Sequence, residues 1–88
     1  MERTALVTGC SSGIGRATAR AFNEEGWTVY ATARDEADLT GLDTETATLD
    51  VTSDEDVERV VDRVIEETGR VDCLVNNAGY GQYGPLED

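Results

Sequence analysis

Residues 6–15 read Leu6-Val7-Thr8-Gly9-Cys10-Ser11-Ser12-Gly13-Ile14-Gly15, and the interpretation of the whole sequence begins from them. Apolar and β-branched residues from Thr4 to Thr8 predict a strand that is buried on both faces. A glycine-rich turn follows, and a helical pattern opens directly after it. Strand, glycine turn and helix in this order are the context in which a turn binds the pyrophosphate of a dinucleotide.

Each glycine of this turn has a physical task. Gly9 permits the sharp turn out of the strand, Gly13 lets backbone approach the pyrophosphate, and Gly15 lets the helix pack closely on the sheet. Free N–H groups at the helix N-terminus attract the phosphates. A plain tight turn is the alternative. The candidate cofactor-binding residues of the turn are Gly9, Ser11, Ser12, Gly13, Ile14 and Gly15.

Strand and helix patterns alternate along the rest of the chain. Strands are predicted at 4–8, 27–33, 46–51 and 71–75, and helices are predicted to end at Gly26 and Gly69. A helical turn is predicted at 37–39 in the acidic loop between the second and third strands. The alternation predicts an α/β fold with a parallel, three-layer Rossmann-type sheet of strand order 3-2-1-4. We therefore expect residues 1–88 to form the first half of a doubly wound domain, with a binding crevice between strands one and four.

Apolar spacing predicts which face each helix buries. One face of the first helix carries Ile14, Ala17, Thr18, Ala21 and Phe22, of which the two alanines are expected to lie close to the sheet. The second helix has two candidate N-caps, Thr52 (in a capping box with Glu55) and Ser53. Its predicted buried stripe consists of Val57, Val60, Val61, Val64 and Ile65.

Charge excludes several classes of function. The chain has 19 acidic against 7 basic residues, all of them arginine, and a formal net charge of −12 without histidine. This balance argues against binding to nucleic acid or an anionic membrane, and neither Cys10 nor Cys73 belongs to a metal-ligand or disulfide pattern. Scattered acid without lysine predicts a protein adapted to a high-salt cytoplasm; an acidic surface in an ordinary cell is the alternative. No apolar run reaches the length of a spanning helix, and a cytoplasmic protein is expected.

The spacing Thr8-Gly9-x-x-x-Gly13-x-Gly15 resembles that of the short-chain dehydrogenase/reductase family, N-terminal half. Asn76-Asn77-Ala78-Gly79, Asp50-Val51 and Gly84-Pro85-Leu86 are similar to further segments of that family. The resemblance implies an oxidoreductase that transfers hydride between a nicotinamide cofactor and an alcohol or carbonyl. It also implies a small-molecule substrate and a homo-oligomer for the complete protein.

The resemblance also implies further cofactor contacts. Asp50 and Val51 are expected at the adenine, with helix capping as the alternative for the Asp50 carboxylate. Contacts near the cofactor ribose are implied for Asn76, Ala78 and Gly79, although Asn76 is expected chiefly to hold the strand end. Leu86-Glu87-Asp88 is compatible with the start of a helix, which would leave the fourth strand as a bare, apolar edge.

The end of the second strand bears on the choice of cofactor. Ala33 stands where NAD-dependent members have an acid for the ribose 2′-OH, and Arg34 follows it. An arginine there pairs with a 2′-phosphate, to which Ser12 could add a hydrogen bond, so we predict NADP. If Arg34 is instead a solvated loop residue, Asp35 takes the ribose and NAD is preferred. Arg16, in the first helical turn, is expected to be exposed.

The catalytic groups that the resemblance implies are missing. They are a Tyr-x-x-x-Lys pair, a serine and a further asparagine, and the chain has no lysine. We therefore assign no catalytic residue and expect the 88-residue chain to be inactive by itself, with the C-terminal catalytic part absent. A non-catalytic dinucleotide-binding module is the alternative function.

Overall fold

The computed structural model describes residues 3–76 and 86–87. Its elements are β1 (Thr4–Val7), α1 (Gly13–Glu24), β2 (Thr28–Ala33), the 3₁₀ helix η1 (Glu36–Leu39), β3 (Glu45–Thr48), α2 (Asp54–Thr68), β4 (Cys73–Asn76) and β5 (Leu86–Glu87). The sheet has the strand order β3-β2-β1-β4-β5. Its first four strands are parallel, which confirms the predicted order 3-2-1-4.

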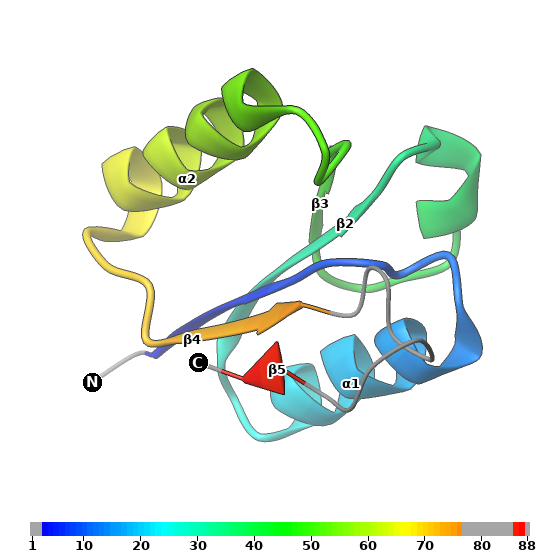
Figure 1. Ribbon diagram of the computed structural model, residues 1–88. Helices are drawn as coiled ribbons and strands as arrows, with labels where there is room; N and C mark the ends of the chain where they lie inside the picture. The colour runs from blue at the N-terminus through cyan, green and yellow to red at the C-terminus, as the bar shows by residue number, and fades with distance from the viewer. Residues whose placement is uncertain (1–2, 77–85, 88) are drawn as a thin grey trace.

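Helices cover both faces of this sheet, α1 on one and α2 on the other (Figure 1). Side chains alternate along β1, so Ala5 and Val7 belong to the core under α1, whereas Leu6 belongs to the core under α2. The α1 layer is built mainly from small side chains, and the α2 layer from larger ones. This arrangement confirms the three-layer prediction.

The edge beyond β4 differs from the expectation. Instead of starting a helix, Leu86 and Glu87 pair antiparallel with Asn76 and Val75. A helix needs several residues fixed before its first hydrogen bond forms, whereas the open backbone groups of an edge strand offer partners at once. The prediction of a helix start and of a bare β4 edge was therefore wrong; Asp88 lies outside the described residues.

Helix α1 buries only part of the face that its apolar spacing predicts: Phe22 packs against the core under α1, but the residues buried most deeply lie elsewhere. Gly15 and Ala19 are its buried residues, whereas Ile14 is 54% exposed and Ala17 and Ala21 are exposed as well. The contact with the sheet selects the smallest side chains, four residues apart, because they allow the closest approach of the two backbones. The spacing of apolar residues does not predict this preference for small side chains at the contact.

Helix α2 follows its predicted signals more closely. Of the two predicted N-cap candidates, Ser53 is confirmed, because its side chain accepts from Asp56 N, and Thr52 is not the cap. Gly69 ends the helix with a left-handed φ of 85°. Val60 and Val64 are buried as predicted, and Val57 and Val61 pack partly against the core. Ile65 lies outside the buried stripe, with 47% of its surface exposed.

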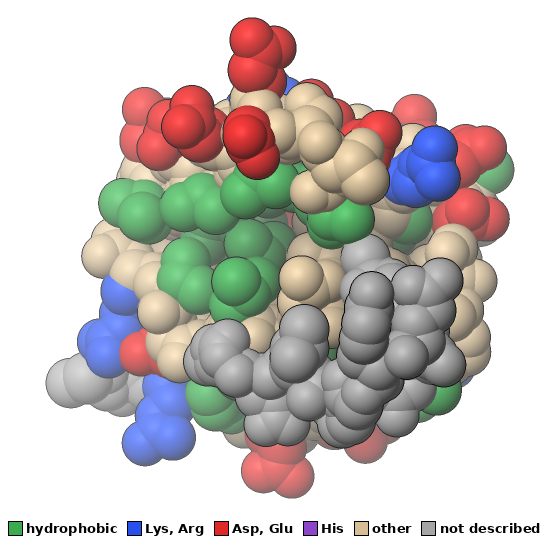
Figure 2. Space-filling model, viewed as in Figure 1, with side chains coloured by type: hydrophobic (Ala, Val, Ile, Leu, Met, Phe, Trp, Pro, Cys, Tyr) green, Lys and Arg blue, Asp and Glu red, His purple; other side chains and the backbone are tan. Residues whose placement is uncertain are grey.

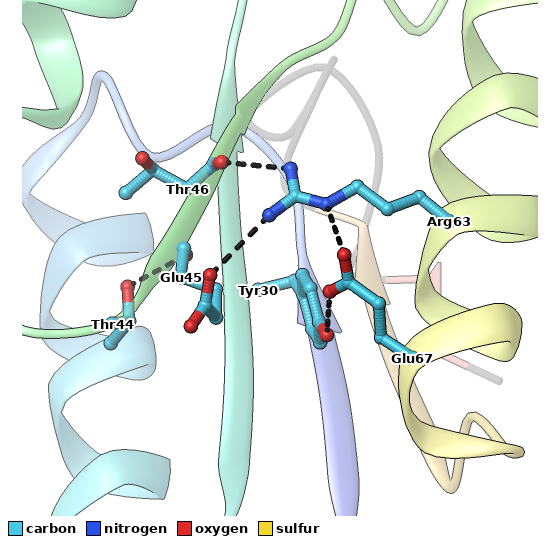
Figure 3. A network of polar contacts seen from close by, with 6 residues as sticks. All are labelled: Tyr30, Thr44, Glu45, Thr46, Arg63 and Glu67. Atoms are coloured by element: carbon cyan, nitrogen blue, oxygen red, sulfur yellow. Dashed lines mark hydrogen bonds and ion pairs between the residues drawn. The ribbon is translucent and has the colours of Figure 1, made fainter.

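A polar network ties α2 to β2 and β3 (Figure 3). The Tyr30 hydroxyl donates to Glu67 Oε1 at 2.6 Å, and Arg63 Nε donates to Glu67 Oε2 at 3.3 Å. Arg63 also donates to the Thr46 carbonyl oxygen at 3.1 Å and to Glu45 Oε1 at 3.3 Å. Its guanidinium lies 5.4 Å from the centre of the Tyr30 ring. One arginine thus connects the helix to the edge strand of the sheet.

Burial of the phenol, followed by the hydrogen bond and charge of Glu67, raises the pKa of Tyr30 from 10.0 to about 12. The phenol is therefore protonated in the folded chain at a pH where the unfolded chain has already lost that proton. The stabilisation is complete below pH 10 and is lost as pH rises toward 12. No lysine titrates in this range, because the chain contains none.

We expect Tyr30→Phe to lower the free energy of unfolding by about 1 kcal/mol at neutral pH, because one hydrogen bond to a charged partner is lost. The variant keeps the ring and its packing. The measurement is urea unfolding followed by circular dichroism over a series of alkaline pH values. The difference between wild type and variant is expected to shrink above pH 10.

The control is Arg59→Met, which removes another arginine of α2 that is 57% exposed, is paired with Asp56 and donates to the Thr48 carbonyl oxygen at 3.2 Å. It is expected to change stability by less than about 0.5 kcal/mol and to keep the alkaline dependence of the wild type. A constant difference between wild type and Tyr30→Phe across this pH range would contradict the role given to the phenol.

Candidate functional site

The candidate site lies at one edge of the sheet, where the parallel strands end. Val7 pairs with Ala31 on one side and with Val75 on the other. The chain leaves β1 through α1 toward β2 and returns to the other side of β1, through α2, as β4. The strand order therefore reverses between β1 and β4, the position at which open α/β sheets bind ligands.

Hydrogen bonds to β2 and to the first turn of α1 fix the conformation of the turn after β1. Gly9 adopts a φ of 69°, as the predicted sharp turn requires. Cys10 N donates to the Thr32 carbonyl oxygen at 2.9 Å, which ties the turn to β2. Ser12 is the N-cap of α1: its Oγ accepts from Gly15 N at 3.1 Å and donates to the Gly9 carbonyl oxygen at 3.2 Å. Its hydroxyl, expected to serve a ligand, thus first caps the helix, while Ser11 is exposed.

Gly15 and Gly13 differ in what surrounds them. A Cβ at Gly15 would lie 2.8 Å from the Gly9 carbonyl carbon and 2.9 Å from Cys10 Cα, closer than real Cβ atoms come. The predicted close packing at Gly15 is therefore a steric necessity. A Cβ at Gly13 would meet nothing within 4 Å. This open space at a helix N-terminus fits a pyrophosphate, which binds to free N–H groups and needs the backbone bare.

Cys10 fills the space beneath the turn. Its side chain is fully buried, and Sγ lies 3.5 Å from the Val7 carbonyl oxygen and 3.7 Å from that of Gly15. Burial raises the pKa of the thiol, more than a hydrogen bond with the Thr32 backbone and the charge of Arg16 lower it. The thiol therefore stays protonated and serves packing.

Thr8 and Asn76 join the two strands that flank the switch point. Thr8 N donates to the Val75 carbonyl oxygen at 2.9 Å, and the Thr8 hydroxyl donates to Asn76 Oδ1 at 3.0 Å. Asn76 thus holds the strand end, as expected. The role of Thr8 was not anticipated, although its place in the motif would have suggested it. Ala78 and Gly79 lie among residues 77–85, outside the described residues.

Charged groups follow β2 and β3 at the same edge. Arg34 is exposed just past β2, and Asp35 caps η1 by accepting from Ala37 N at 3.0 Å. Asp50 Oδ1 accepts from the Thr52 hydroxyl at 2.6 Å and from Thr52 N at 2.9 Å. These bonds and the nearby positive charge of Arg34 lower the pKa of Asp50. Thr52 precedes α2, whose N-cap is Ser53, so the helix-capping alternative for the Asp50 carboxylate was wrong; its adenine contact stays a prediction.

Two apolar residues complete the predicted set. Ile14 stands at the first turn of α1 with more than half its surface exposed. Val51 is half-buried and packs against the core under α2. An exposed isoleucine beside the glycine turn is the kind of apolar surface that a bound ligand covers.

Arg16 was expected to be exposed, and the structure corrects this. Its side chain is half-buried, and its guanidinium donates to the carbonyl oxygens of Asp38 at 2.6 Å and Thr40 at 2.9 Å. Only a contact between segments distant in sequence produces this arrangement, so no local pattern signals it.

Within residues 3–76 and 86–87, no helix has the length and apolar character needed to cross a membrane. In the same part of the chain, no group of three or more His, Cys, Asp or Glu side chains is arranged to hold a metal ion.

Fold and site together define a Rossmann-type nucleotide-binding protein. Residues 3–88 match the family model for short chain dehydrogenase, and the chain belongs to this family of oxidoreductases.

The relatives that the chain resembles are longer than the chain. It is 43% identical over 82 residues to the 3-ketodihydrosphingosine reductase of Bacteroides thetaiotaomicron, covering 93% of this chain and 30% of the relative. It is 44% identical over 87 residues to the sulfoacetaldehyde reductase 2 of Chromohalobacter salexigens, covering 90% of this chain and 34% of the relative. The chain thus spans about a third of the length of these relatives.

Solved structures of short-chain dehydrogenases and ketoreductases share the fold of this chain. The F189W actinorhodin polyketide ketoreductase with NADPH superposes with a TM-score of 0.79 at 40% identity, over 86% of this chain and 33% of that one. A short-chain dehydrogenase from Streptomyces avermitilis gives a TM-score of 0.80 at 44% identity, over 88% and 31% of the two chains.

We expect Gly15→Ala to lower the free energy of unfolding by about 2 kcal/mol or more, because the added methyl collides with backbone atoms that cannot move aside independently. Urea unfolding measured by circular dichroism and by Trp27 fluorescence tests this.

Gly13→Ala is the matched control, since the same methyl meets nothing there. It is expected to leave stability unchanged or to raise it by up to about 1 kcal/mol, because alanine favours the helix. Equal losses in the two variants would contradict the steric role of Gly15.

Proposed function

We propose that the complete protein is an NADP(H)-dependent oxidoreductase that transfers hydride between the cofactor and a small alcohol or carbonyl compound, and that this chain supplies its dinucleotide-binding half. The observation that carries the proposal is the glycine turn at the N-terminus of α1, next to the reversal of strand order between β1 and β4. The names of the reductase relatives and the NADPH-bound ketoreductase neighbour support it.

The choice of NADP over NAD rests on two side chains at the end of β2. Arg34 is exposed and offers a planar fork that matches a 2′-phosphate. Asp35, the acid that would select NAD, already accepts a hydrogen bond from Ala37 N as the cap of η1. An acid with this structural task is less available to a ribose hydroxyl.

The residues of this chain bind and orient the cofactor. The N–H groups of the turn, with Ser11 and Ser12, hold the pyrophosphate, while Ile14 covers an apolar part of the cofactor. Asp50 and Val51 border the adenine, and the segment starting at Asn76, with Ala78 and Gly79, borders a ribose. When bound, the nicotinamide supplies or accepts the hydride.

We expect Arg34→Ala to weaken NADPH binding by about 10- to 100-fold, since a charge-assisted pair with the 2′-phosphate is lost. NADH binding should change by less than about twofold, because that cofactor has no 2′-phosphate. The measurement is a fluorescence titration of the chain with each cofactor.

Asp35→Asn is the control at the neighbouring position, and it is expected to keep the preference for NADPH because an asparagine also caps η1. If Arg34→Ala weakens both cofactors equally, the NADP assignment fails. If the wild-type chain binds neither cofactor, the proposed function of the chain fails as well.

A non-catalytic dinucleotide-binding module is the second candidate. The observation that favours it is that the chain contains no lysine, so no Tyr-x-x-x-Lys pair is available to transfer a proton. We propose that the chain alone does not turn over substrate. Oxidation of an alcohol by the isolated chain would contradict this part of the proposal. Homo-oligomerisation of the complete protein is proposed from the family alone, and cytoplasmic location is proposed from the apolar pattern of the sequence.

Adaptation to high salt is proposed from charge. The formal net charge is −12, and acidic side chains crowd the surface over α2 above a band of hydrophobic ones (Figure 2). The carboxylates repel one another, which opposes folding, and they also repel an anionic cofactor. Salt screens both kinds of repulsion.

Raising the KCl concentration is therefore expected to increase both the free energy of unfolding and the affinity for NADPH. Full folding and unchanged affinity in low salt would contradict the proposal.

A further inference from the structure

We propose that Arg16 is a positioning residue for cofactor choice: it clamps the segment 34–40, which carries Arg34 and Asp35, onto the helix that holds the pyrophosphate. This inference rests on the proposed function and extends it from the residues that touch the cofactor to one that sets their position.

The clamp is a single guanidinium with two bonds. One terminal nitrogen of Arg16 donates to the Asp38 carbonyl oxygen at 2.6 Å and the other donates to that of Thr40 at 2.9 Å. Both carbonyls lie at the C-terminal end of η1, where a short helix leaves acceptors without intrahelical partners and where positive charge is favoured. A planar fork serves two such acceptors at once without much loss of side-chain freedom.

Two further contacts fix the remainder of this segment. At its start, Asp35 caps η1 through Ala37 N. Near its end, Leu39 is 5% exposed and packs in the same core cluster as Cys10, directly beneath the glycine turn. The Asp35 bond lies within the segment itself, whereas Leu39 and Arg16 attach the segment to other elements, and Arg16 connects η1 directly to α1. Without it, the segment keeps its start and its apolar anchor but loses the polar link to the phosphate-binding helix.

The geometry of the following turn supports the same assignment. Gly41 adopts a φ of 88°, and a Cβ there would lie 3.6 Å from the Arg16 guanidinium. The chain thus bends around the guanidinium immediately after Thr40. Since Arg16 directly follows Gly15, any shift of this contact changes the distance between the turn that binds the pyrophosphate and the residue that binds the 2′-phosphate.

The test compares Arg16→Met with Arg20→Met in the full 88-residue chain. Arg20 lies one helical turn further along α1, is exposed, and loses the same charge on substitution. Two quantities are measured: NADPH and NADH affinity by fluorescence titration, and hydrogen exchange of the amides at 37–42 without cofactor. Circular dichroism verifies that each variant is folded.

Arg16→Met is expected to weaken NADPH binding by about tenfold and NADH binding by less than about twofold, while exchange at 37–42 accelerates. Arg20→Met is expected to change none of these. Arg16→Lys keeps the charge but not the two-carbonyl fork, and it is expected to lose selectivity as well. This variant also keeps the test decisive if Arg16→Met does not fold.

Three results would overturn the inference. The first is an unchanged NADPH-to-NADH affinity ratio in Arg16→Met, and the second is a wild-type affinity ratio in Arg16→Lys. The third is unchanged hydrogen exchange of the amides at 37–42 in Arg16→Met. In each of these cases, the proposed function still holds if the wild-type chain binds NADPH more tightly than NADH. If the wild-type chain binds neither cofactor, the inference falls together with the proposed function.

Discussion

The contact between Gly15 and the turn after β1 is the constraint on which the other features depend. Because Gly15 lacks a side chain, helix α1 rests directly on the backbone of Gly9 and Cys10. This contact fixes the first helical turn, so that Ser12 caps it and its N–H groups face the sheet edge. Ala19 continues the close approach one turn later. The same short distance brings Arg16 within reach of η1.

The two helical layers obtain their stability in different ways. Under α1 the buried centre consists mainly of small side chains, with Phe22 and Trp27 packed against it. Under α2, Tyr30 and the valines of the helix form the core, and Arg63 adds polar bonds to the edge strand. The glycine turn lies on the α1 side, where the N-terminus of α1 directly follows the end of β1. The α2 side chiefly holds the sheet together.

Much of the fold was predictable because its signals are local. Glycines with positive φ, such as Gly26 and Gly69, end helices for reasons contained in their own backbone. The buried face of α1 was not predictable from periodicity, since Gly15 carries no apolar side chain to count. In the candidate site, the glycine turn was predicted from motif spacing, and the cofactor contacts of Arg34 and Asp50 stay predictions. Arg16 was missed because its partners are 22 and 24 residues away.

The pairing of β1 with two neighbours also has a consequence for how the chain folds. Bringing β1 onto β2 closes a loop of about 24 residues, whereas bringing it onto β4 closes one of about 68. The longer closure costs about 1 kcal/mol more in chain entropy, so the β1-α1-β2 unit has the lower kinetic barrier. The boundary between early and late folding units therefore runs between β1 and β4. A ligand that binds across that boundary binds only when β4 is docked on β1. Its binding therefore stabilises the docking of β4, and the two processes are thermodynamically coupled.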